Sequence, residues 1–371
     1  MTNRRDFLRK LVYAGGALAT TGYNPAAWSQ GSYSGKLLIN VQLVGGWDVT
    51  SFCDPKENVA GELEINHWAN SASIDQVGNL TYAPFATTRQ FFEKYYQRML
   101  VINGVDTQTN AHDVGEIVSW SGRTAQGYPS LTALMAASIA PDLALSYLNF
   151  GGFGNTEGLI RSTRINNPKS IRNIIFPNRS RYTYDFRRNQ LLQSDWERIQ
   201  ARHLEMLAPA SQPNDLLARD RLNRQYYHDA LTRADSIKAF GHLIPSADAI
   251  QQPRENSTLH QQAQMTLLAF KAGVAVCADL VDGGYDTHRD HDRDQERVLV
   301  NSLDGIDYLW ELAEELDLAD RLLVVIGSDF GRTPHYNADQ GKDHWPIGSY
   351  VVMEKNVDWT NRVVGETDEG H

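Results

Sequence analysis

Short runs of apolar residues alternate with stretches of helical periodicity along most of the chain. The apolar runs predict strands at residues 37–44, 99–105, 145–150, 274–281, 322–327 and 349–353. Helical patterns separate most of them, at about residues 214–237, 258–272 and 293–316. Strands that alternate with helices are typical of an α/β fold, so we expect a mainly parallel sheet flanked by helices.

The stretch from about residue 151 to residue 256 has a different pattern. It is polar and rich in helical periodicity, and no clear strand lies at its centre. Ser194 and Glu197 have the spacing of a capping box, which predicts a helix that begins at Ser194. We expect this stretch to be a helical insertion or cap on the sheet.

The N-terminus has the pattern of an export signal. Arg4 and Arg5 precede a short apolar stretch, and small residues at Ala27 and Ser29 suit a signal peptidase. The apolar stretch is too short to span a bilayer. Residues 1–29 therefore predict a twin-arginine signal peptide, export to the periplasm or beyond, and no stable membrane span after cleavage. The alternative is a basic amphipathic helix.

Charge and cysteine content narrow the class of protein. The chain carries a net charge of −10, and removal of residues 1–29 makes it about −13, which disfavours binding to nucleic acid. The basic segment, residues 161–188, is either a solvated face or a site for an anionic polymer. Cys53 and Cys277 are the only cysteines, so we predict buried thiols and no thiolate cluster.

Acidic residues and histidines follow the predicted strands. Asp48 comes after the first strand, Asp286 and His288 come after the run at 274–281, and Asp329 comes after the run at 322–327. In open α/β sheets ligands bind at the carboxyl ends of the strands, so these side chains are expected to converge. A downstream "GKDHWP" adds Asp343 and His344.

Carboxylates and imidazoles without thiolates suit Zn, Mn, Fe or Mg ions. Gathered acids repel one another unless a cation lies among them. The alternative for each residue alone is a structural role, such as capping a turn. Arg332, beside Asp329, is a candidate contact for a phosphate or sulfate, and His291 and Lys342 are weaker candidates in the same loops.

The motifs "LVGGWD", "NAHDVGEIVSWSGR", "GGYDTH", "SDFGRTP" and "DHW", in this order, resemble the exported domain-of-unknown-function family 1501, a branch of the alkaline phosphatase and sulfatase superfamily. The resemblance implies an alkaline-phosphatase-like fold with a two-metal site. The metal ligands that it implies are Asp48, Asp286, His288, Asp329 and His344. His112 lies where the superfamily presents its nucleophile and neighbouring groups.

The chain also departs from that pattern. Phe330 stands where the superfamily usually has a histidine, and no serine nucleophile follows the second strand, which leaves the hydroxyls of Thr107 and Thr109. The family generally continues beyond the last residues here, so we expect an incomplete C-terminus. The leading hypothesis is an exported metal-dependent hydrolase of phosphate or sulfate esters. The alternative is an exported binding or matrix-associated protein that retains the fold without catalysis.

Overall fold

The computed structural model describes residues 33–167, 171–179, 188–208, 216–244 and 258–368. The strands are β1 (Leu37–Val44), β2 (Asp75–Val77), β3 (Leu80–Tyr82), β4 (Met99–Asp106), β5 (Tyr147–Asn149), β6 (Ser162–Arg164), β7 (Cys277–Gly283), β8 (Leu322–Ser328), β9 (Gly331–Arg332), β10 (His344–Trp345), β11 (Ile347–Glu354) and β12 (Arg362–Val364). The α-helices are α2 (Thr88–Tyr95), α3 (His112–Ser121), α4 (Leu131–Ile139), α5 (Ile171–Ile175), α6 (Gln193–Leu207), α7 (Ala218–Thr232), α8 (Ala234–Leu243), α9 (Leu259–Lys271) and α10 (His291–Glu315).

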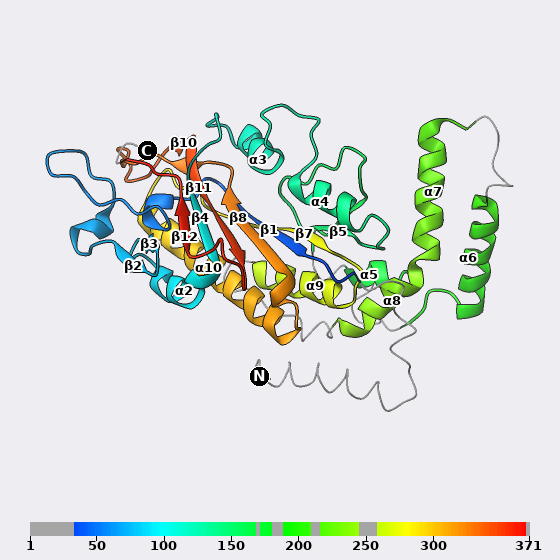
Figure 1. The fold of residues 1–371 in the computed structure, drawn as a ribbon. Helices are drawn as coiled ribbons and strands as arrows, with labels where there is room; N and C mark the ends of the chain where they lie inside the picture. The colour runs from blue at the N-terminus through cyan, green and yellow to red at the C-terminus, as the bar shows by residue number, and fades with distance from the viewer. Residues whose placement is uncertain (1–32, 168–170, 180–187, 209–215, 245–257, 369–371) are drawn as a thin grey trace.

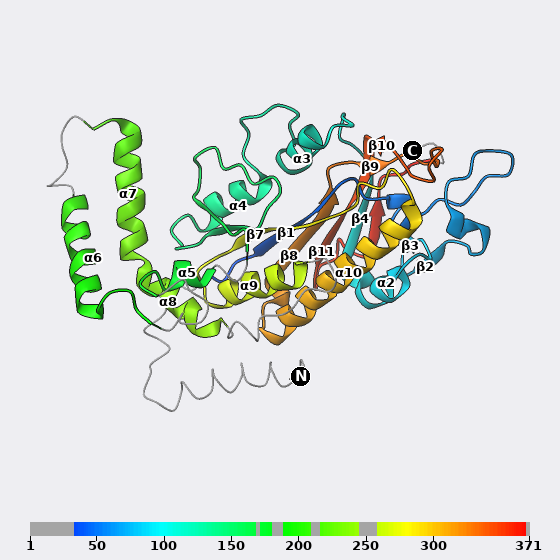
Figure 2. The same ribbon diagram turned by 180° about the vertical axis from the view of Figure 1, so that it is seen from behind.

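One mainly parallel sheet organises these elements, as the sequence predicts. Its strand order is β12-β4-β11-β8-β1-β7-β5-β6. Only β11 runs antiparallel to its neighbours β4 and β8, and the other pairings are parallel. Helices α3 and α4 lie on one face, and α9 and α10 lie on the other (Figures 1 and 2). The carboxyl ends of β1, β4, β7 and β8 therefore share one edge.

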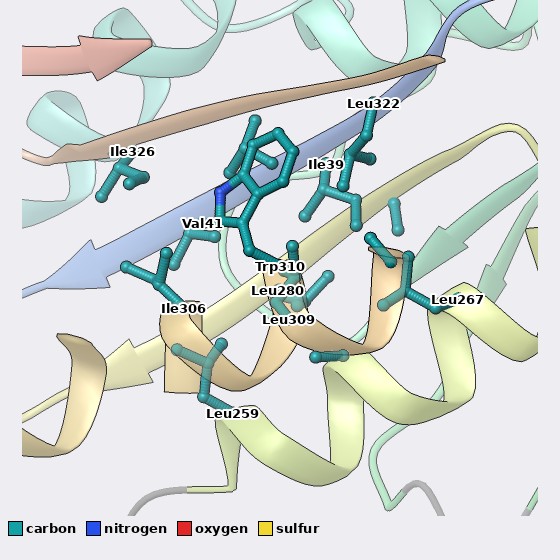
Figure 3. Packing of buried hydrophobic residues seen from close by; sticks show 14 of the residues in the cluster. Ile39, Val41, Leu259, Leu267, Leu280, Ile306, Leu309, Trp310, Leu322 and Ile326 are labelled. Carbon is teal, nitrogen blue, oxygen red and sulfur yellow. The ribbon is translucent and has the colours of Figure 1, made fainter. Parts of the chain in front are cut away.

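The central strands are held by the apolar faces of α9 and α10. Ile306, Leu309 and Trp310 follow helical spacing on α10 and pack against Ile39 and Val41 of β1 (Figure 3). Trp310 is fully buried. Truncation of a buried tryptophan to alanine typically costs about 3–5 kcal/mol, so this contact fixes the helix layer under the strands that lead to the site.

The predicted strands agree with the observed ones to within a few residues, and the largest shift has a physical cause. β7 begins at Cys277 rather than at residue 274. The Val274 N–H donates to Ala269 O at 3.1 Å, which uses the start of the apolar run to close α9. The predicted helix at 214–237 is likewise divided at Arg233 into α7 and α8.

The capping-box prediction at Ser194 is wrong. Helix α6 begins at Gln193, its N-cap is Leu192, and no side-chain hydrogen bond caps it. The prediction rested only on the spacing of Ser194 and Glu197. Because Ser194 lies inside the first turn of α6, it is not the N-cap residue. Helices α6 and α7 lie side by side at the end of the molecule away from β9 and β10 (Figures 1 and 2). That the stretch 151–256 forms a cap remains a prediction.

Two further expectations concern the whole chain. Cys53 and Cys277 are both buried free thiols, as predicted, and burial raises the pKa of each. Among the described residues, no helix is both long and apolar enough to cross a bilayer. Residues 1–29, which carry the predicted export signal, lie outside the described residues.

Candidate metal centre

The loops that follow the parallel strands bring the predicted residues to one edge of the sheet. His112 begins helix α3 after β4, and Asp286 and His288 lie in the loop after β7. Asp329 directly follows β8, and His344 lies on β10, which pairs with β9. The convergence that we expected from strand ends is therefore observed for Asp286, His288 and Asp329, and His112 and His344 lie at the same edge.

Two glycines let the β1 loop pass close to this edge. Gly45 and Gly46 have φ values of 118° and 78°, which side chains other than glycine rarely adopt. A Cβ atom on Gly45 would lie 2.5 Å from the backbone nitrogen of Asp286. The Gly45 and Gly46 N–H groups donate to Asp329 Oδ1 at 3.1 and 2.6 Å. Backbone donors thereby fix one carboxylate oxygen and leave the other for His112.

Three histidines are each held by their Nδ1 atom. His112 Nδ1 bonds Asp329 Oδ2, His288 Nδ1 lies 2.7 Å from Asp343 Oδ1, and His344 Nδ1 lies 2.7 Å from the Asn110 carbonyl oxygen. Each of these oxygens accepts a hydrogen bond, so each neutral imidazole carries its proton on Nδ1. The Nε2 atom of each ring is left with its lone pair. Metal-bound histidines in proteins are oriented in this way.

The three Nε2 atoms point toward Asp286. His288 Nε2 lies 3.0 Å and His344 Nε2 lies 3.2 Å from Asp286 Oδ1. His112 Nε2 lies 3.6 Å from Asp286 Oδ2, and the two nitrogens of His288 and His344 are 3.0 Å apart. Ligands at about 2.0–2.1 Å from a tetrahedral ion are separated by about 3.3 Å. The distances of His288 and His344 from Asp286 are close to this separation, and His112 lies slightly farther away.

An unsatisfied atom supports the same interpretation. His112 Nε2 is buried and finds no hydrogen-bond partner among the described residues. His112, Asp286 and His344 also form a group whose ligand atoms all lie within 4.8 Å of one another. Lone pairs that face one another without a donor are unfavourable unless a cation lies among them. His112, Asp286 and His344 thus fit a divalent metal ion with two nitrogen ligands and one carboxylate, and His288 Nε2 lies 3.0 Å from the same carboxylate.

Arg332 has a different role from the anion contact that the sequence suggested. Its guanidinium is fully buried and donates to the carbonyls of Gly45, Gly46 and Lys342 and to Asp286 Oδ1, the last at 2.7 Å. Burial tends to raise the pKa of Asp286, but interactions led by the hydrogen bond and positive charge of Arg332 lower it to about 2. Arg332 therefore keeps Asp286 ionised and in place.

Phe330 occupies the position where the resemblance led us to expect a histidine. Its buried ring lies 4.7 Å from the His112 ring and 4.6 Å from the His344 ring, between ring centroids. Contacts of this kind restrict the orientation of both imidazoles. The residue that removes one expected ligand thus packs against two of the ligands that remain.

The hydroxyls of Thr107 and Thr109 make local bonds. The buried Thr107 side chain donates to the Pro346 carbonyl at 2.9 Å. Thr109 Oγ1 accepts from the Ala111 N–H at 3.1 Å. Both bonds shape the loop between β4 and α3, which presents His112. Their role as nucleophiles remains a prediction.

Asp48 lies in a second, closed cluster at the same edge. Its Oδ2 atom accepts from Lys342 Nζ at 2.8 Å, His291 Nε2 at 2.9 Å and Ser51 Oγ at 3.1 Å. Its Oδ1 atom accepts from the Thr50 N–H at 3.0 Å and the Thr50 hydroxyl at 2.6 Å. Burial tends to raise its pKa, but Lys342 and His291 lower it well below the ordinary value. Asp48 therefore has partners that differ from those of the other predicted ligands.

Sequence reasoning gave no supporting role to several residues that hold the centre in place. Asp343 and the Asn110 carbonyl hold His288 and His344, and both positions are adjacent in sequence to a predicted site residue. Glu116 lies one helical turn after His112, and burial together with the charge of Asp329 raises its pKa. A search for acceptors beside each histidine would have given this role to Asp343, but a backbone carbonyl carries no sequence signal.

A mainly parallel sheet with histidines and a carboxylate at its C-terminal edge defines an α/β protein with a candidate metal centre. The chain belongs to DUF1501, a family described as a protein of unknown function, which matches residues 35–369. This match confirms the family resemblance seen in the motifs. No curated protein matches the chain.

Solved structures with a related arrangement are distant in sequence. A structure of Ps i-CgsB is 9% identical with a TM-score of 0.40, and the alignment covers 88% of this chain and 68% of that one. The lipoteichoic acid synthase LtaP from Listeria monocytogenes is 11% identical with a TM-score of 0.34, and coverage is 90% and 70%. A mutant of TAB5 alkaline phosphatase is 10% identical with a TM-score of 0.32, and coverage is 86% and 91%.

Proposed function

We propose that this protein is an exported metal-dependent hydrolase of phosphate or sulfate esters. The observation that carries the proposal is the convergence of three imidazole Nε2 atoms on Asp286, with each Nδ1 atom held by an acceptor. Such a centre needs a cation, and it is partly open to solvent, since the Asp286 side chain is 48% exposed. An ester can therefore reach it.

The ligands favour certain ions. His112, His288 and His344 offer nitrogen, and Asp286 offers oxygen, a mixture that suits Zn, Mn or Fe better than the all-oxygen sites preferred by Mg. When bound, the ion supplies positive charge and Lewis acidity to an ester oxygen. Asp329, Asp343 and the Asn110 carbonyl hold the imidazole rings so that their lone pairs face the ion.

The geometry favours water as the nucleophile. The Thr107 hydroxyl donates to the Pro346 carbonyl, and Thr109 Oγ1 accepts from the Ala111 N–H. Attack by water forms a bond from oxygen to phosphorus or sulfur and breaks the bond to the leaving alcohol, which takes up a proton. Glu116, with its raised pKa, is a candidate to hold a proton near His112.

Turnover of model substrates tests the proposal. Protein purified in its exported form is stripped with a chelator, reloaded with Zn, Mn or Fe, and assayed with aryl phosphate, sulfate and phosphonate esters. We expect turnover only after reloading, and it should persist in the double variant Thr107→Ala and Thr109→Ala. Loss of turnover in this variant with full metal content would instead indicate a covalent threonine route. No metal-dependent turnover with any ester would refute the proposal.

One observation favours a second function. Arg332 is buried and uses four of its five N–H donors on three carbonyls and Asp286, so it does not offer its fork to a substrate anion. The alternative is an exported binding or matrix-associated protein that retains the metal centre. Its basic segment, residues 161–188, lies partly outside the described residues, and Arg161 is engaged by Asp229 at 3.4 Å. Binding of an anionic polymer without any ester turnover would support this alternative.

Export is a separate part of the proposal. The twin-arginine machinery reads Arg4 and Arg5, so we expect that lysine at both positions leaves the precursor in the cytoplasm. Fractionation of cells that express each form gives the answer. Normal amounts of the lysine variant outside the cytoplasm would contradict the export route but not the metal centre.

A further inference from the structure

The resemblance to alkaline phosphatases implies two metal ions, with Asp48 as a ligand, and the Asp48 cluster does not fit this. A carboxylate has about four lone-pair positions. Asp48 accepts from five donors, which come from Thr50, Ser51, His291 and Lys342. Its side chain is also buried, with 1% exposure. No lone pair of this carboxylate is left for a metal ion.

The Lys342 ammonium has the surroundings of a bound cation. Besides Asp48 Oδ2, it donates to Asn66 Oδ1 at 2.9 Å and to Thr50 Oγ1 at 3.1 Å. These three oxygens use the three donors of the ammonium group. Its nitrogen also lies 5.1 Å from the centre of the Tyr336 ring, within the range of a cation–π contact. An oxygen-lined pocket that is closed around one positive charge is thus complete without an added ion.

This pocket is joined to the metal centre by short links in the backbone. Lys342 lies two residues before His344, and its N–H donates to the Thr287 carbonyl at 3.1 Å, between Asp286 and His288. Its carbonyl accepts from Arg332 Nη1 at 2.9 Å. The backbone of Lys342 is therefore tied to the loops of the candidate metal centre, while its ammonium lies with Asp48 after β1, where the resemblance placed a metal ligand.

We propose that the ammonium of Lys342 permanently fills a second cation site at this edge, so that the protein binds at most one divalent ion there. The one divalent ion that remains would bind at the histidine centre. In this respect the inference rests on the function proposed above. A covalently attached charge does not exchange with solvent. The positive charge of Lys342 is therefore present whatever the metal concentration. Only the occupancy of the histidine centre depends on that concentration.

The first test counts ions in the wild-type protein. Elemental analysis after purification in excess Zn or Mn should give one ion per chain. Two ions per chain that both survive dialysis would overturn the inference and leave the hydrolase proposal intact. A chain without any ion would contradict the hydrolase proposal, and the variants described next then decide the role of Lys342 separately.

The second test empties the pocket. In a chain that also carries His112→Ala and His344→Ala, which disables the histidine centre, Lys342→Ala should lower the melting temperature because Asp48 loses its buried counter-charge. Potassium chloride or manganese chloride should then raise the melting temperature again, relative to choline chloride at equal ionic strength. If Lys342→Ala does not fold alone, refolding yield with and without the ions replaces the melting temperature.

A charge-free pair provides the matched control. Asp48→Asn with Lys342→Met, in the same background, keeps the size of the side chains and removes both charges. This control should show no response to potassium or manganese. If Lys342→Ala is folded and responds to neither ion, or if the control responds as strongly, the pocket is not a cation site and the inference is wrong.

Discussion

The histidine centre and the Asp48 cluster lie at the same edge of the sheet and use the same kinds of side chain, but they are in opposite states. At the histidine centre, lone pairs of His112, His288 and His344 face Asp286 without donors between them. In the Asp48 cluster every carboxylate lone pair has a donor, and the charge of Lys342 is enclosed. The first arrangement is suited to an added cation, whereas in the second Lys342 already supplies the positive charge.

This difference shows how to interpret strand-end acids in such sheets. Position at the carboxyl end of a strand brings an acid to the right edge, but its neighbours decide whether it binds an ion. A lysine within reach converts a metal ligand into half of an ion pair. Histidines whose far nitrogen is held by an acceptor convert a nearby acid into a ligand.

The largest expected effect comes from Asp286→Ala, because this removes the one carboxylate on which the three imidazoles converge. We expect loss of the bound ion and of all metal-dependent turnover, together with the stabilisation that the ion gives to the folded state. Metal analysis and thermal melting measure both. Asp339→Ala is a matched control, since Asp339 is an exposed carboxylate in the neighbouring loop and should change neither. Full metal content in Asp286→Ala would refute the centre.

A somewhat smaller effect is expected from Arg332→Lys. The guanidinium satisfies three buried carbonyls and Asp286, and a lysine ammonium cannot reproduce this planar set of donors. Breaking a buried, paired charge network typically costs about 3–5 kcal/mol. Urea unfolding should show a loss of this order. A loss below about 1 kcal/mol, which is typical of an exposed pair, would show that Arg332 does not hold the loops together.

Asp329→Asn should act on the ion through His112. The backbone donors of Gly45 and Gly46 can still bond the amide oxygen, so the fold should persist. The amide NH₂ then faces His112 Nδ1, which favours the tautomer with its proton on Nε2 and removes that lone pair. Loss of such a supporting partner typically lowers metal affinity by about 10–100-fold. Competition with a chelator of known affinity measures the change, and unaltered affinity would place Asp329 outside this role.

The smallest expected effect is the dependence of stability on pH that comes from the Asp48 cluster. Burial lowers the pKa of His291 and the ion pair lowers that of Asp48, so the unfolded chain binds more protons than the folded one in acid. The contribution of these two groups to stability should be constant above about pH 6.5 and fall below it, first through His291 and then, below about pH 4, through Asp48. Each group contributes at most about 1.4 kcal/mol per pH unit. The free energy of unfolding, measured at a series of pH values in the presence of a chelator, tests this prediction. Asp48→Asn should reduce its dependence on pH below pH 4. Equal slopes for the wild type and Asp48→Asn below pH 4 would show that Asp48 does not contribute to this loss of stability.

Much of the fold and part of the site could be predicted from the sequence. The apolar runs defined the central strands because buried parallel strands carry continuous apolar residues, and β1 matches its prediction at both ends. Strand-end position also predicted that Asp286, His288 and Asp329 would lie at one edge, and the family resemblance added His112 and His344. The role of Asp48 could not be predicted, because its partner Lys342 lies 294 residues away and only the folded chain brings them together.

The position of β1 in the middle of the sheet determines when this edge can form. The strand is synthesised first, but its neighbours are β7 and β8, which emerge near the end of the chain. His112 and Asp329 are 217 positions apart, so the growing chain on the ribosome holds no histidine centre and no pocket for Lys342. Contacts of such high sequence separation form late and slowly. An ion can therefore contact all of these residues only after β10 has been synthesised, and a chain that ends before β10 lacks His344.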